Sequence, residues 1–107
     1  LAGSVMLEAF AGAGFRVAGE AFADRGYEPE GSLTPRGRPG ALKETPEEAA
    51  RQALSIALDG EVVGAGGARV PLHAQTICLH SDTPGAPAFA RAIAERLQAA
   101  GVVLRAL

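Results

Sequence analysis

Two polar side chains, His80 and Asp82, directly follow an apolar run that we predict to be a buried strand over Thr76–Leu79. Residues two apart in an extended chain point to the same side, so this pair can act together. A histidine near a carboxylate can serve as a general base, a metal ligand or an oriented hydrogen-bond donor. The alternative is structural: Asp82 or Thr83 caps the helix that Pro84 begins, and His80 is only the polar end of a strand. The spacing leaves both interpretations open.

A second group of ionisable residues, Glu20, Asp24 and Arg25, follows a short apolar strand predicted over Phe15–Gly19. Carboxylates held close together can divide acid and base roles between them, and an arginine can clamp an anion. The alternative is a structural ion pair that anchors the loop that comes next. The residue types alone do not decide between a site and an anchor.

The loop after this group, Tyr27–Leu42, is long and rich in glycine and proline. Structureless loops of that length in compact domains are usually functional or disordered, and the position after a strand end favours function. Arg36 and Arg38 either reach back over the site or remain solvated charges. Tyr27 either closes over a ligand or fills the base of the loop.

The other reactive side chains are expected to be structural. Cys78, the only cysteine, lies inside the predicted strand and is expected to be an inert core thiol. The segment Gly64–Gly67 lacks the Lys-Ser/Thr pair of a phosphate loop, so we expect a hairpin turn. His73 is expected at the surface, and the two histidines and the cysteine do not have the spacing of a zinc site. No metal site is therefore predicted.

The flanking sequence predicts the elements that position these residues. Each is recognised by apolar periodicity and by a start or stop signal, such as the capping box that begins the second helix. In chain order they are a helix (Ser4–Ala13) with an apolar stripe at Met6, Leu7 and Phe10, a strand (Phe15–Gly19), a helix (Thr45–Asp59), a hairpin (Glu61–Val63 with Ala68–Val70), a strand (Thr76–Leu79), a helix (from Pro84 to Gly101) and a final strand (Val102–Leu107).

The order strand, helix, strand, helix, strand predicts an α/β fold with parallel core strands and a small β-hairpin. This is either a parallel sheet or a slice of a barrel. Substrates of such folds bind at the carboxyl ends of the strands. Both groups of ionisable residues are therefore expected on one face, and an active site there is the leading hypothesis.

Length and charge limit the possible functions. A chain of 107 residues with a net charge of −2 can hold one modest core and gives no signal for binding nucleic acid or an acidic membrane. No apolar run approaches the roughly 20 residues that span a bilayer, and a reducing cytoplasm is the simpler expectation for one cysteine. Parallel sheets usually have more strands than this chain offers. We therefore expect residues 1–107 to be a single partial domain, the C-terminal portion of a longer protein.

Three motifs in the right order resemble the C-terminal signature of the LamB/YcsF family, and they span Glu20–Tyr27, Leu33–Ala41 and Thr76–Pro84. The resemblance covers essentially the whole chain. It implies a (β/α) barrel-like fold related to polysaccharide deacetylases. It also implies ATP-dependent opening of 5-oxoproline (pyroglutamate) to L-glutamate in the cytoplasm, together with 5-oxoprolinase subunits B and C.

The resemblance also suggests roles for the candidate residues. A five-membered lactam is a stable amide, so its carbonyl needs activation before water attacks, and ATP is the implied co-substrate. Cationic groups would hold phosphate or carboxylate and acidic or basic groups would serve the carbonyl. The binding candidates are Arg25, Arg36 and Tyr27, and the catalytic candidates are His80, Asp82, Glu20 and Asp24.

Two departures from the family pattern affect these expectations. Ser81 stands where the family usually has glycine, and serine would strain or narrow the site if a positive φ or a close approach were needed there. The family's amino-terminal acidic and histidine-containing motifs are absent, so the piece is expected to be inactive alone. Two alternatives remain: a carbohydrate or N-acyl hydrolase of the deacetylase-like group, which needs a metal, and a non-catalytic module that docks partner subunits.

Overall fold

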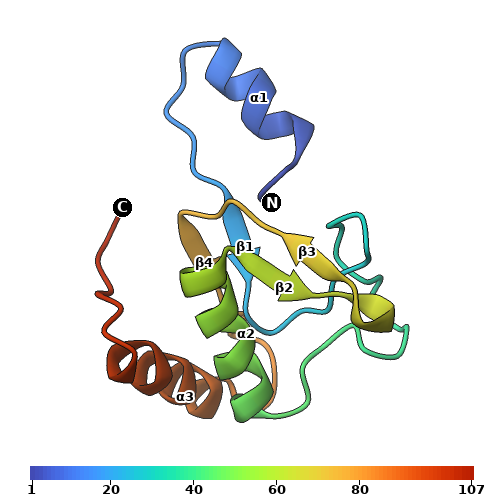
Figure 1. Cartoon of the computed structure of the whole chain (residues 1–107), viewed down its shortest axis with the longest axis vertical. Helices are drawn as coiled ribbons and strands as arrows, with labels where there is room; N and C mark the ends of the chain where they lie inside the picture. Colours follow the sequence, from blue (N-terminus) through green and yellow to red (C-terminus); the bar gives the residue numbers. More distant parts are fainter.

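The computed structural model describes residues 1–107 as a mixed α/β arrangement around two small sheets (Figure 1). The elements are, in order, α1 (Val5–Gly12), β1 (Glu20–Phe22), α2 (Pro46–Asp59), β2 (Glu61–Val63), a 3-10 turn η1 (Ala65–Gly67), β3 (Arg69–Pro71), β4 (Thr76–Cys78) and α3 (Ala86–Ala99). The α/β class, the parallel core strands and the hairpin are confirmed.

Strands β1 and β4 pair in parallel, with Glu20 opposite Thr76 and Phe22 opposite Cys78. They are far apart in sequence, and the connection between them contains the long loop, α2 and the hairpin. Parallel pairing puts the carboxyl ends of both strands at the same end of the sheet. The residues that follow β1 and β4 therefore emerge side by side.

The second helix begins as its sequence predicts. The Thr45 hydroxyl accepts a hydrogen bond from the amide of Glu48 at 3.2 Å, and the Glu48 carboxylate accepts one from the amide of Thr45 at 3.3 Å. This reciprocal capping box, with Pro46 in the first turn, fixes where α2 starts. Gly60 ends the helix with φ of 66°, a left-handed conformation that glycine adopts without strain.

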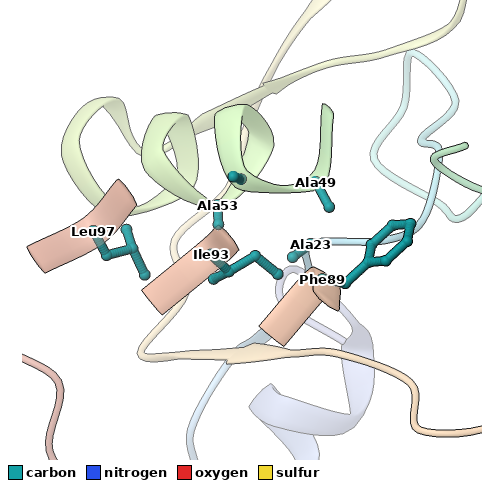
Figure 2. Packing of buried hydrophobic residues seen from close by; sticks show 7 residues of the cluster. Ala23, Ala49, Ala53, Phe89, Ile93 and Leu97 are labelled. Carbon is teal, nitrogen blue, oxygen red and sulfur yellow. The ribbon is translucent and has the colours of Figure 1, made fainter. Parts of the chain in front are cut away.

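The main core lies where α2 and α3 pack over the end of β1 (Figure 2). Small residues on α2, Ala49 and Ala53, let the two helices approach closely. Large residues on α3, Phe89 and Ile93, fill the space between them, and side chains of this size each contribute about 1.5–3 kcal/mol when buried. Ala23, directly after β1, belongs to the same cluster. The chain just before Asp24 is thus held inside the core.

The hairpin of β2 and β3 is antiparallel, with Val62 opposite Val70. Both valines are buried in a second apolar cluster together with Ala21, Tyr27, Ile56 and Leu72. The turn expected at Gly64–Gly67 contains the 3-10 turn η1, and no helix follows it. Because Val62 and Val70 share this cluster with Tyr27, the hairpin packs against the start of the loop after β1.

Two strand predictions toward the ends of the chain are wrong, whereas the first helix is confirmed but is left uncovered. The segment Phe15–Gly19 is not a strand, because β1 begins only at Glu20. Val102–Leu107 forms no strand, so the order of core elements ends at α3. The helix expected over Ser4–Ala13 is present as α1, but none of its residues is buried: Met6 and Phe10 are exposed and Leu7 is half-buried, on a helix that stands apart from the body (Figure 1). In each case the apolar pattern is present but no other segment of this chain covers it.

No helix of the structure combines the length and the apolar character required to cross a membrane.

Candidate active site

The structure brings Asp24 and His80 together at the carboxyl ends of the two parallel strands. The Nδ1 atom of His80 lies 2.9 Å and 3.0 Å from the two carboxylate oxygens of Asp24. The backbone amide of His80 donates a further hydrogen bond to the same carboxylate at 3.1 Å. The strand register accounts for the pair, because Phe22 is opposite Cys78 and the next residues on the same side are Asp24 and His80.

This geometry fixes the proton on the imidazole ring. The carboxylate of Asp24 accepts hydrogen bonds, so Nδ1 of His80 is the donor in this contact, and in the neutral form of the ring Nε2 carries the lone pair. The Asp24 side chain is 1% exposed, whereas the His80 side chain is 23% exposed. A buried carboxylate thus orients a partly exposed histidine. That arrangement suits a general base that takes a proton at Nε2 and returns it later.

An aromatic side chain packs on the imidazole ring, and a cysteine precedes His80 on the chain. Phe22 stacks on the imidazole with ring centres 5.5 Å apart and an angle of 21° between the planes. Cys78, the last residue of β4, precedes His80 by two residues, and burial raises the pKa of its thiol, with smaller contributions from the negative charges of Glu20 and Asp24. The thiol is held in its neutral form, as expected for a structural cysteine.

Arg25 anchors the long loop. Its Nε donates to the carbonyl of Ala41 at 3.1 Å, and its Nη2 donates to the carbonyl of Thr34 at 2.9 Å, all within the interior. Arg25 thus anchors the loop as the structural alternative expected, but through backbone carbonyls and not through the expected ion pair. Arg36, by contrast, is fully in the exposed part of the loop.

Tyr27 fills the base of the loop. Its side chain is buried, and its hydroxyl accepts a hydrogen bond from the amide of Phe22 at 2.8 Å. Burial raises the pKa of Tyr27 above its usual value of 10.0. The hydroxyl of Tyr27 therefore holds the backbone of β1 in place at Phe22.

Gln52 is a site-supporting residue that the sequence reasoning missed. Its side-chain amide donates to the carbonyls of Phe22 at 2.8 Å, Ala23 at 3.2 Å and Arg25 at 2.7 Å. These three carbonyls surround Asp24 in the chain, so α2 holds the backbone on both sides of the carboxylate. The signal in the sequence is that Gln52 is a polar residue on the otherwise apolar buried face of α2, between Ala49 and Ile56.

The other candidates are not brought to the Asp24–His80 pair. Glu20 opens β1, at the opposite end of the strand from Asp24. Asp82 is exposed in the turn before α3, and the helix is capped by Gly85 without any side-chain cap, so neither Asp82 nor Thr83 has the capping role. Ser81 has no positive φ, and the backbone strain considered for a serine at this position is therefore absent.

No group of three or more histidine, cysteine, aspartate or glutamate side chains lies close enough together to hold a metal ion. The Asp24–His80 pair alone supplies two such groups. A metal at this position would require further ligands from outside this chain.

Known families and proteins include clear matches to this chain. The LamB/YcsF family model matches residues 1–107. A protein from Methylococcus capsulatus, named as the A subunit of 5-oxoprolinase, is 50% identical over 106 residues, which cover 99% of this chain and 41% of that protein. The protein of the same name from Streptomyces griseus is 46% identical, with 99% of this chain and 42% of that protein covered.

Among solved structures, a crystal structure of a lactam utilization protein from Thermus thermophilus is similar, with a TM-score of 0.92 at 46% identity. The match covers 100% of this chain and 42% of that one. The chain thus spans about two fifths of the length of the relatives it matches.

Proposed function

Because the chain belongs to the LamB/YcsF family, we propose that it carries the acid–base pair of the A subunit of a 5-oxoprolinase. The proposed reaction is ATP-dependent opening of 5-oxoproline to L-glutamate, in the cytoplasm and together with subunits B and C. The observation that carries the proposal is the Asp24–His80 pair at the carboxyl ends of β1 and β4. The names of the relatives support the substrate class.

His80 has the central role in this proposal. Its Nε2 takes a proton from a water molecule as that water adds to the lactam carbonyl carbon, and the same proton then goes to the ring nitrogen as the C–N bond breaks. Asp24 holds the ring in the required tautomer and stabilises the imidazolium that forms in between. The products are L-glutamate, whose carboxylate and amino group come from the opened lactam, together with ADP and inorganic phosphate from the ATP consumed.

The amide carbonyl also needs activation, which ATP supplies when it is bound. The residues of this chain offer little to hold a nucleotide: the glycines of the hairpin form a turn, and Arg25 is engaged with loop carbonyls through Nε and Nη2. Arg36 remains an exposed cation within the anchored loop. We therefore place the nucleotide site mainly on the rest of the family fold or on the partner subunits.

The barrel-like architecture belongs to the same proposal. Two parallel strands cannot close a barrel, and a parallel sheet normally has both faces covered. The chain spans about two fifths of its relatives' length. We therefore expect activity only when the remaining part of the fold is present.

The test is an assay for ATP-dependent glutamate release by the chain completed with the rest of the family fold and with subunits B and C. The His80→Gln variant should lose at least about 100-fold in kcat, in the range that general acid–base catalysis contributes. The matched control is His73→Gln, since His73 is the other histidine and is exposed. Unchanged turnover in His80→Gln would remove His80 from the mechanism and favour a non-catalytic docking module.

A further inference from the structure

A cavity of about 340 Å³ lies between α2 and β2, the strand that follows this helix on the chain (Figure 1). Only two of its seven lining residues are apolar, and neither member of the Asp24–His80 pair is among them. Four lining residues share one face of α2, namely Glu48, Arg51, Gln52 and Ser55. Lys43, at the end of the long loop, adds a second cation to this mostly polar lining.

The two cations of the cavity have no ion-pair partner. Lys43 and Arg51 both line it, and neither forms an ion pair in the structure. Burial lowers the pKa of the Lys43 ammonium group, while the Glu48 carboxylate raises it and the Arg51 charge lowers it. Two like charges at one cavity repel each other, and an anion bound beside them favours their charged forms.

The cavity also contains one negative charge. The Glu48 carboxylate uses Oε2 to accept hydrogen bonds from the amides of Glu44 at 2.9 Å and Thr45 at 3.3 Å, and these bonds lower its pKa. The carboxylate therefore stays ionised, and its Oε1 takes part in neither bond. An ammonium group of a ligand can donate to this oxygen. A polyphosphate is disfavoured, because its clustered negative charge would lie beside the carboxylate.

The cavity is linked to the backbone of the candidate active site. The amide of Lys43 donates to the carbonyl of Asp24 at 2.9 Å. The side chain of Gln52, on the cavity wall, donates to the carbonyls of Ala23 and Arg25, which flank Asp24 in the chain. A ligand in the cavity would therefore contact two residues that hold the Asp24 backbone, without touching the catalytic pair.

We infer that this cavity binds an amino acid with an acidic side chain. Such a molecule carries two carboxylates and one ammonium group, which is the reverse of the two cations and one carboxylate of the lining. Its short apolar stem would pack against Val62 and Val63. The volume is at the lower end of the roughly 300–1,000 Å³ of small-molecule sites, which suits a ligand of this size. L-Glutamate is the probe, and this choice rests on the proposed function, in which it is the product.

The experiment titrates the chain with L-glutamate and follows its backbone amides by NMR. We expect saturable shifts at Arg51 and Ser55, which line the cavity, and not at His80. Glutarate has the same two carboxylates but no ammonium group, so it should bind about tenfold more weakly or worse, as expected for the loss of a hydrogen bond between charged groups. L-Glutamine lacks the second carboxylate and should be weaker by about the same factor.

Three substitutions connect the binding to named groups. Arg51→Gln removes a cation from an exposed position and should weaken L-glutamate binding by about tenfold or more. Glu48→Gln keeps the capping box, which accepts glutamine at this position, but removes the negative charge. It should weaken the binding of L-glutamate and should not weaken that of glutarate. The matched control is Arg91→Gln, because Arg91 is exposed on α3 outside the cavity and should change binding by less than about twofold.

Four results would overturn the inference: no saturable binding of L-glutamate, shifts centred on His80, equal binding of L-glutamate and either analogue, or equal effects of Arg51→Gln and Arg91→Gln. Inorganic phosphate that binds as tightly as L-glutamate would also overturn it, because the cavity would then be a general anion site. Binding is scored without ATP, partner subunits or turnover. L-Glutamate bound at the cavity of a protein that opens no 5-oxoproline would therefore leave the inference standing and count against the proposed function alone.

Discussion

The Asp24→Asn substitution tests the orientation of His80 directly. Asparagine keeps the shape of the side chain but replaces one acceptor oxygen with an NH2 group that can only donate. The carboxylate of Asp24 now receives two hydrogens from His80, one from the backbone amide and one from Nδ1. In the variant the NH2 group faces Nδ1 if it takes the place of Oδ1, and faces both Nδ1 and the backbone amide if it takes the place of Oδ2, so at least one N–H of His80 meets a donor where it had an acceptor. The ring must then either lose its bond or move its proton to Nε2.

The expected magnitude follows from burial. Asp24 is 1% exposed, so solvent cannot replace the lost partner. A hydrogen bond to a charged group contributes about 1.5–3 kcal/mol, and the variant loses one of them. We expect the free energy of unfolding to fall by that amount, which is a large share of the roughly 5–15 kcal/mol typical of a folded domain.

Two measurements on the chain test this reasoning. Urea denaturation gives the change in stability, and nitrogen NMR of the imidazole reports which ring nitrogen carries the proton. The control is Asp82→Asn, because Asp82 is exposed and should change stability by less than about 0.5 kcal/mol. The reasoning is refuted if native His80 carries its proton on Nε2, or if Asp24→Asn lowers the free energy of unfolding no more than the control substitution does.

Three further predictions concern the residues around the pair. Gln52→Ala leaves buried carbonyls without a donor and should lower the free energy of unfolding by about 1–3 kcal/mol in urea denaturation; a loss below about 0.5 kcal/mol would contradict this role. The absorbance titration of Tyr27, the only tyrosine, should have its midpoint above pH 10.0. Because the folded state holds this proton more tightly than the unfolded state, its contribution to stability is complete below pH 10 and declines as the pH rises further; a midpoint at or below 10.0 would show that the hydroxyl is not buried. Cys78, whose raised pKa disfavours the thiolate, should react with a thiol reagent at pH 8 more slowly in the native chain than in urea, and equal rates would contradict its burial.

The sequence predicted best the elements that neighbouring residues determine, such as helix starts and tight turns. The capping box at Thr45 and Glu48 fixes the start of α2, and glycines mark the turn of the hairpin, so both were predicted nearly as they occur. The parallel pairing of β1 and β4 followed from the alternation of strands and helices. The first helix formed as predicted but its apolar stripe has no cover, and Val102–Leu107 forms no strand, because an apolar pattern indicates which face should be covered but not whether the chain contains its cover.

Spacing along the sequence identified residues of the candidate site but not which of them lie together. The sequence grouped His80 with Asp82 and Asp24 with Glu20, because it measures separation along the chain. The structure instead pairs Asp24 with His80, which are 56 residues apart, through the register of two short strands.

That register is itself set by close packing at the start of β1. The amide of Gly19 donates to the side chain of Gln75 at 2.7 Å, and a side-chain carbon at Gly19 would lie only 2.7 Å from the carbonyl of His73. A slip of one residue would turn either His80 or Asp24 to the other face of the sheet and separate the pair. The chemistry of the site therefore depends on a glycine contact at the opposite end of the strands, and this dependence can be found only from the three-dimensional arrangement.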